Sequence, residues 1–176
     1  DTVFVFHLRD GLKWSDGEPV TMEDVRFAFE DVLFHEELTP VFPTYLRPGL
    51  RADLPPAEFK VIDDLTFQLS FSEPYGTFPA QISIAQWRSY GDFIKPRHYL
   101  EQFHLKYASK SRLRELMREE SIPDGQWFTL FTAKQMTSNV DGSNPQFLGH
   151  PTLTPWTMQK AASGVYTYVR NPYYFK

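Results

Sequence analysis

The sequence contains no cysteine among its 176 residues. Disulfide bridges, thiolate zinc sites and a cysteine nucleophile are therefore excluded. There is also no apolar run of the length that a bilayer-spanning helix needs, and no recognisable signal peptide. The missing cysteines do not fix a compartment, because many exported proteins do without disulfides.

An excess of positive charge is also missing. Lysine and arginine number 18 against 22 aspartates and glutamates, which gives a net charge of −4. A nucleic-acid partner requires a basic face, so we expect none. The basic residues between 110 and 118 are interleaved with glutamates, which is typical of a solvated helix face.

The patterns that mark catalytic and metal sites are absent too. The sequence has no G-x-S-x-G elbow and no glycine-rich phosphate loop. None of the five histidines has a partner at metal-binding helical spacing, and we expect His7 to be a buried core residue. Asp16 and Glu18 could form a glycosidase-like carboxylate pair, but we interpret Asp16-Gly17 as a turn. We therefore expect no enzyme activity, no metal and no cofactor.

What is present is a consistent strand, turn and helix at the start of the chain. Residues 3–8 are β-branched and aromatic with apolar side chains on both faces, which predicts a central strand covered on both sides. Thr21 and Asp24 have the spacing of a capping box. An apolar stripe then predicts a helix with one face in the core; its members are Val25, Ala28, Phe29, Val32 and Leu33.

The rest of the chain predicts alternating short strands and helices. Residues 59–62 and 65–71 flank an Asp63-Asp64 turn and predict a β-hairpin. Helices are expected at 76–85, at about 97–103, after Ser109 or Ser111, and after Asp124-Gly125, followed by a loop over 137–155 and a strand around 165–169. The fold class is thus α/β (α+β), with a small mixed sheet flanked by helices.

Three segments carry a family resemblance. Residues 6–25, which read FHLRDGLKWSDGEPVTMEDV, closely resemble the signature of the family 5 extracellular solute-binding proteins. These are the oligopeptide- and dipeptide-binding receptors of bacterial ABC importers. Residues 93–100 (FIKPRHYL) and 170–175 (RNPYYF) are similar to two further family segments, in the family's order. One departure is the segment 151–156, PTLTPW, which stands where classical members carry a G-x-G-P-Y turn.

The resemblance implies a fold and an organisation. Members have a two-lobed, periplasmic-binding-protein-like type II fold, are about three times longer than this chain, and begin with an export signal, usually a lipoprotein one. We expect residues 1–135 to be the small subdomain of lobe I and residues 136–176 to be the loop and strand leading back to the main lobe. The C-terminal lobe would then be absent from this piece.

The same resemblance implies a function. The intact protein would be a monomeric extracytoplasmic receptor, anchored as a lipoprotein, that captures a short peptide or other small solute and delivers it to an ABC permease. Two alternatives stay open. The module could be the sensor domain of a cytoplasmic transcription regulator, or an extracytoplasmic enzyme if a carboxylate pair lines a closed pocket.

Candidate ligand-binding residues come from the surplus of aromatic side chains. Trp87 and Trp156 lie in irregular, polar contexts, where a large ring has less reason to be buried. In the family, the loop after the first helix and the residues before the FIKPRHYL-like segment approach the ligand cleft. That correspondence adds Tyr45 and Gln86, with Arg88 as a carboxylate partner.

Overall fold

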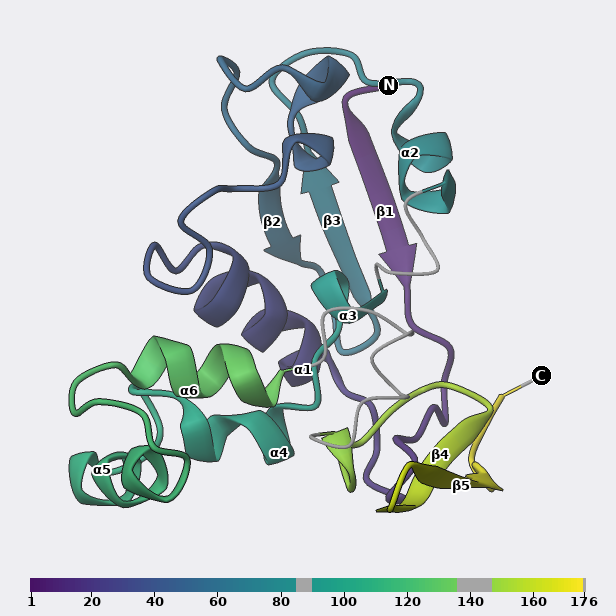
Figure 1. Cartoon of the computed structure of the whole chain (residues 1–176). Helices are drawn as coiled ribbons and strands as arrows, with labels where there is room; N and C mark the ends of the chain where they lie inside the picture. The colour runs from purple at the N-terminus through teal and green to yellow at the C-terminus, as the bar shows by residue number, and fades with distance from the viewer. Residues whose placement is uncertain (85–89, 136–146, 176) are drawn as a thin grey trace. The chain divides into compact units, whose positions relative to one another are not determined.

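The structure, a computed structural model, describes residues 1–84, 90–135 and 147–175 (Figure 1). The chain forms two compact units. Unit 1 comprises residues 1–12 and 19–94, and unit 2 comprises residues 13–18 and 95–176. Among the described residues, no helix combines the length and the apolar character needed to cross a bilayer.

Unit 1 is built on a three-stranded antiparallel sheet in the order β1-β3-β2. The strands are β1 (Val3–His7), β2 (Glu58–Val61) and β3 (Thr66–Ser70), and β2 and β3 form the predicted hairpin. The central strand buries the apolar side of its alternating pattern, with Phe67 at 3% and Leu69 at 0% exposure. Figure 1 shows β3 between its two neighbours.

The position of β1 corrects two predictions. It pairs only with β3 among the described strands, and its Val3 and Val5 side chains are 46% and 59% exposed, so the strand is not covered on both faces. Phe4 and Phe6 on the other face pack against the core. His7 is exposed, and its Nδ1 lies 2.9 Å from the Thr66 hydroxyl oxygen, so it is not a core residue.

The first helix begins as predicted. Thr21 is the N-cap of α1 (Met22–Arg26), and its amide donates to the Asp24 carboxylate at 2.9 Å in a capping box. The helix continues as a π-helical stretch, η1 (Phe27–Leu33), and all five residues of the predicted stripe are buried. That stripe packs on β3 through contacts such as Phe29 with Phe67.

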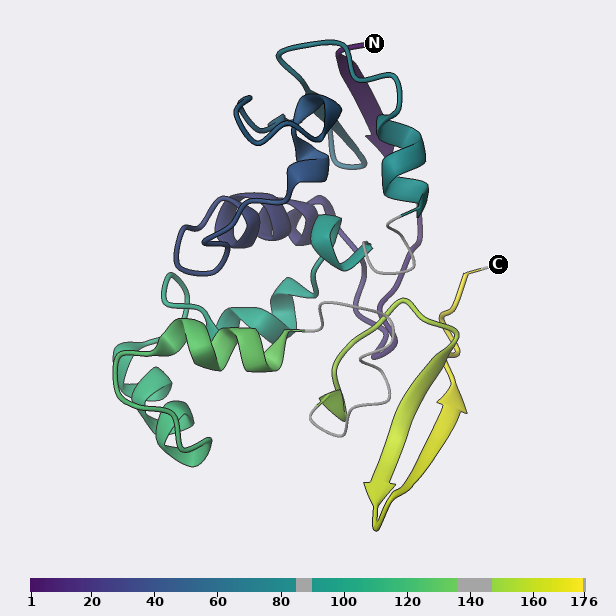
Figure 2. The same cartoon turned by 45° about the horizontal axis from the view of Figure 1, so that its top comes forward.

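Short elements complete the core of unit 1. They are η2 (Thr44–Leu46), η3 (Pro48–Leu50), α2 (Phe78–Ile84) and α3 (Tyr90–Phe93). Both views show α2 alongside β1, and Phe78 of α2 packs edge-on against Phe4 at 5.0 Å between ring centroids (Figure 2). The core is thus aromatic and lies between the sheet and these helices.

Unit 2 contains a small group of helices. These are α4 (Arg97–Leu100), its continuation η4 (Glu101–Phe103), α5 (Lys110–Glu119) and α6 (Trp127–Lys134). Ser109 caps α5 by accepting from the Arg112 amide at 3.2 Å. The predicted inner faces of α5 and α6 are buried, with residues Leu113, Leu116, Met117, Trp127, Leu130 and Phe131 all at or below 7% exposure.

Unit 2 ends in an antiparallel hairpin of β4 (Trp156–Ala162) and β5 (Val165–Arg170), which both figures show as a separate two-stranded ribbon. Ser163 and Gly164 at the turn have φ of 51° and 77°, which is the signature of a type I′ turn. The sequence predicted β5 but not β4. Trp156 therefore opens a strand and does not sit in irregular chain.

The predicted class is confirmed in its mixed helix and strand content and its small sheets. The strand pairings in the described residues are all antiparallel, where a mixed sheet was expected. The expected boundary at residue 135 stays a prediction.

Candidate functional site

The predicted ligand-binding residues fall in both units. Tyr45 belongs to unit 1 and Trp156 to unit 2, while Gln86, Trp87 and Arg88 lie outside the described residues. The structure therefore places two of the five, each within its own unit, and leaves their roles as predictions.

Tyr45 is held by a hydrogen bond at its tip. It sits in η2, and its hydroxyl donates to Oδ2 of Asp92 in α3 at 2.7 Å. Burial raises the pKa of the phenol far above its usual value, and the nearby Asp92 charge and the hydrogen bond raise it further. The hydroxyl is consequently a neutral donor at physiological pH whose oxygen can still accept a hydrogen bond.

Trp156 is a large exposed side chain. It begins β4 opposite Arg170 of β5 and is 59% exposed. Its carbonyl oxygen accepts from the Thr154 hydroxyl at 2.8 Å, which fixes the backbone at the point where the strand begins. The indole ring itself is a large apolar surface open to solvent.

The family-like segments meet inside unit 2. The turn at residues 13–18 contacts the segment after Pro96 through His98, whose Nε2 lies 2.8 Å from the Asp16 carboxylate. Trp14 of the same turn is 1% exposed, and its ring lies 6.5 Å from that of His98. A positive φ of 96° at Gly17 brings the turn against Tyr173.

Residues 150–154 join the same junction. The Ser15 amide donates to the Thr152 carbonyl at 3.0 Å, and the Thr152 amide donates to the Ser15 hydroxyl oxygen at 3.0 Å. Asn171, 1% exposed, donates from Nδ2 to the Thr154 carbonyl at 3.0 Å and accepts from the Tyr173 amide at 2.9 Å. Ser15 and Thr152, which are 137 positions apart, are thus joined by two hydrogen bonds.

His150 is a buried ionisable group of this junction. Its Nδ1 lies 2.8 Å from the Pro151 carbonyl oxygen, its ring packs on Tyr99 at 4.9 Å, and it is 8% exposed. Burial is the main reason that its pKa is lowered to about 4, with the charges of Lys95 and His98 lowering it further. The imidazole is accordingly neutral near pH 7, with Nδ1 as the protonated nitrogen.

These contacts hold the fold of unit 2 together. Within the described ranges, no three histidine, aspartate or glutamate side chains gather in a way that could hold a metal ion. His98 and Asn171 lie within the family-like segments, but the sequence predicted a junction role neither for them nor for His150, which was weighed only as a possible metal ligand. The family-like segments themselves were the one available signal, since the Asp16–His98 partners are 82 positions apart.

Comparisons with known proteins agree with the motifs. The family model described as "Bacterial extracellular solute-binding proteins, family 5 Middle" matches residues 1–176. A periplasmic alpha-galactoside-binding protein of Rhizobium meliloti is 35% identical over 106 residues, which are 58% of this chain and 14% of that protein. The periplasmic oligopeptide-binding protein OppA of Salmonella typhimurium is 34% identical over 86 residues, 43% of this chain and 16% of that protein.

Solved structures share the fold. A structure of the oligopeptide-binding protein OppA is 31% identical with a TM-score of 0.70, covering 99% of this chain and 24% of that one. The periplasmic binding protein MelB of Agrobacterium fabrum C58, in complex with stachyose, is 24% identical with a TM-score of 0.63, covering 98% of this chain and 21% of that one. The chain thus spans about a quarter or less of the length of these relatives.

Proposed function

Since the chain belongs to family 5 of the bacterial extracellular solute-binding proteins, we propose that it is part of a receptor that captures a short peptide and delivers it to an ABC-type membrane permease. The observation that carries the proposal is the agreement between a family match over the whole chain and a similar OppA structure at 31% identity. The proposal includes an extracytoplasmic location, supported by periplasmic relatives, with a lipoprotein anchor and a monomeric state in the complete protein. No chemical reaction is part of it.

The five candidate residues have distinct roles in this proposal. Trp156 supplies an exposed aromatic wall on which an apolar side chain of the solute packs. Tyr45 supplies a neutral hydroxyl whose oxygen accepts from a peptide amide while its own O–H group donates to the Asp92 carboxylate. Gln86 and Trp87 supply further contacts to the solute, and the Arg88 guanidinium pairs with a peptide carboxylate. The proposed subdomain boundary remains at residue 135.

A second solute class has an observation in its favour. The similarity to an alpha-galactoside-binding protein extends over 106 residues at 35% identity. Sugars stack on exposed indole rings as apolar side chains do, so Trp156 would serve an oligosaccharide equally well. Peptide and oligosaccharide are therefore the two classes that an experiment must separate.

The test is calorimetric titration of the complete receptor with tetra-alanine and with stachyose. We expect saturable binding of the peptide and none of the sugar, and the reverse result would assign the receptor to oligosaccharides. Trp156→Ala should weaken peptide binding about tenfold, as expected for loss of one stacked aromatic contact. Tyr166→Ala, which removes another exposed ring of the same hairpin, is the matched control and should change the affinity less than twofold.

The 176-residue chain provides a further check. Because it spans about a quarter of a similar receptor, it should bind tetra-alanine at least a hundredfold more weakly than the complete protein. Micromolar affinity of the chain alone would contradict the idea that the cleft is shared with the rest of the receptor.

A further inference from the structure

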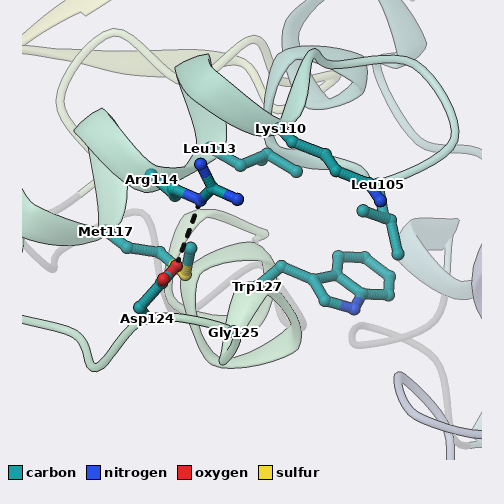
Figure 3. Close-up of a pocket in the computed structure, with 8 residues that line it drawn as sticks. All are labelled: Leu105, Lys110, Leu113, Arg114, Met117, Asp124, Gly125 and Trp127. Atoms are coloured by element: carbon teal, nitrogen blue, oxygen red, sulfur yellow. Dashed lines mark ion pairs between the residues drawn. The ribbon is translucent and has the colours of Figure 1, made fainter.

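An open pocket of about 300 Å³ lies in unit 2, apart from the candidate ligand-binding residues and the junction (Figure 3). One face of α5, the turn before it and the start of α6 form its walls. The lining residues are Leu105, Lys110, Leu113, Arg114, Met117, Asp124, Gly125 and Trp127. The four contributed by α5 follow the i, i+3, i+4, i+7 spacing of a single helix face.

The floor of the pocket is apolar and firmly packed. Leu113, Met117 and Trp127 line the pocket and are only 2%, 3% and 4% exposed, so they are held in place by packing on their other sides. The Trp127 indole is fixed edge-on by His104 at 5.0 Å between ring centroids. A ligand therefore meets a preformed aromatic and aliphatic surface, which costs little reorganisation.

The rim is cationic. Lys110 has no hydrogen-bond or ion-pair partner within the described parts of the chain, and Arg114 meets the Asp124 carboxylate only through Nε at 3.8 Å. Figure 3 shows this pair facing each other across the rim, with Lys110 beside Leu105. By contrast, Arg112 on the same helix is paired with Glu115 at 2.7 Å and does not line the pocket. Two cations against one exposed carboxylate leave the rim with net positive charge.

We propose that this pocket binds a small amphipathic carboxylate, with its ring or short alkyl chain against Trp127 and its carboxylate between Lys110 and Arg114. The apolar floor disfavours a phosphate or sulfate ion, which would lose hydration without gaining contacts there. The net charge disfavours an organic cation. A carboxylate satisfies the unpaired ammonium and can accept from the guanidinium, while the body of the molecule covers apolar surface.

This site is independent of the proposed solute capture. It uses none of the five candidate ligand-binding residues, and it lies entirely within residues 105–127 of unit 2. It would give the receptor a second, smaller ligand whose presence does not depend on peptide binding.

The test uses the 176-residue chain and 3-phenylpropionate, with 3-phenylpropylamine as the cationic analogue, followed by the indole NMR resonance of Trp127. We expect a saturable shift with the carboxylate and none with the amine. The double variant Lys110→Gln/Arg114→Gln should bind about tenfold more weakly, because two charge-assisted contacts are lost. Arg112→Gln removes a cation of the same helix outside the pocket and should change the affinity less than twofold.

A second variant protects against an effect on folding. Leu105→Trp fills the pocket from an exposed position, so it should abolish binding while the far-UV circular dichroism spectrum stays unchanged. The proposal is overturned if the carboxylate gives no saturable shift, if the amine binds equally well, or if the double variant and Leu105→Trp both retain wild-type affinity.

Discussion

Replacing Asn171 by alanine should destabilise unit 2 strongly. The side chain is 1% exposed and joins the chain after β5 to the segment before β4. Its Nδ2 donates to the Thr154 carbonyl at 3.0 Å and, at 3.5 Å, to that of Thr152, while its Oδ1 accepts from the Tyr173 amide at 2.9 Å. Alanine removes all three contacts and leaves their backbone partners without the amide.

The expected loss follows from counting those contacts. A buried hydrogen bond contributes about 1 kcal/mol net, and a buried polar group left unpaired costs about 1–3 kcal/mol. The two shorter bonds dominate, because the 3.5 Å contact is at the limit of hydrogen-bond length. Asn171→Ala should therefore lower the free energy of unfolding by about 2–4 kcal/mol, a large share of the stability of a typical domain.

Urea unfolding of the 176-residue chain, followed by tryptophan fluorescence and circular dichroism, measures this loss. With a slope of about 2 kcal/mol/M, the midpoint should fall by about 1–2 M. The matched control is Gln102→Ala, which removes an amide donating to the Tyr99 carbonyl at 2.8 Å from an exposed position. It should cost less than about 0.5 kcal/mol, because solvent replaces the bond. If Asn171→Ala costs no more than Gln102→Ala, the junction is not held by this side chain.

Three further predictions concern the same unit and its turns. The free energy of unfolding should fall as the pH is lowered from 6.5 to about 4, because the pKa of His150 is lowered to about 4 in the fold and the unfolded chain binds its proton first. The loss is about 3 kcal/mol at most. Urea titrations across that pH range measure it, and His150→Gln should flatten the profile. In thermal melts, Gly17→Ala should lower the free energy of unfolding by about 1 kcal/mol more than Gly11→Ala. Both glycines have positive φ, but a Cβ on Gly17 would lie 3.1 Å from the Tyr173 hydroxyl oxygen, whereas one on Gly11 would meet nothing within 4 Å. Equal losses of stability would refute the contact with Tyr173. At the hairpin turn, Ser163→Asn should stabilise the hairpin by a few tenths of a kcal/mol and Ser163→Val should destabilise it by about 1 kcal/mol, since φ is 51° there. Hydrogen exchange of the β5 amides ranks the stability of the two variants. The inverted ranking would exclude the type I′ turn.

Local patterns predicted much of the fold. The Thr21–Asp24 capping box, the stripe after Val25 and the inner face of α5 each depend on residues within one or two turns of one another. For the same reason the β2–β3 hairpin was predictable, because its turn and the alternation on β3 are contiguous in the sequence.

Two strands were described wrongly or missed, one because its partners are distant in the sequence and one because its own pattern is interrupted. The apolar residues of β1 suggested a strand covered on both sides, but the strand order leaves Val5 exposed, and strand order is not encoded in the strand itself. β4 was missed because Gln159 and Lys160 interrupt its apolar pattern at the place where the register with β5 shifts.

The candidate site was harder still. Its junction contacts bridge 82 positions between Asp16 and His98 and 137 between Ser15 and Thr152, which no periodicity reveals. Only the resemblance to a family indicated that these segments matter together. The ligand-binding role of Tyr45 and Trp156 rests on that resemblance and stays a prediction.

The short loop of residues 13–18 has a practical consequence for anyone who wishes to dissect the molecule. The polypeptide passes between the two units three times, after Leu12, after Glu18 and after Ile94. A truncation starting at Lys95 would discard Ser15, which bonds to Thr152, and the Asp16 carboxylate beside His98, so it should express as a poorly folded peptide. Cutting the chain after Ile94 alone would leave residues 13–18 of unit 2 attached to unit 1. A separable unit 2 would need residues 13–18 to be joined to residues 95–176 in a rearranged chain.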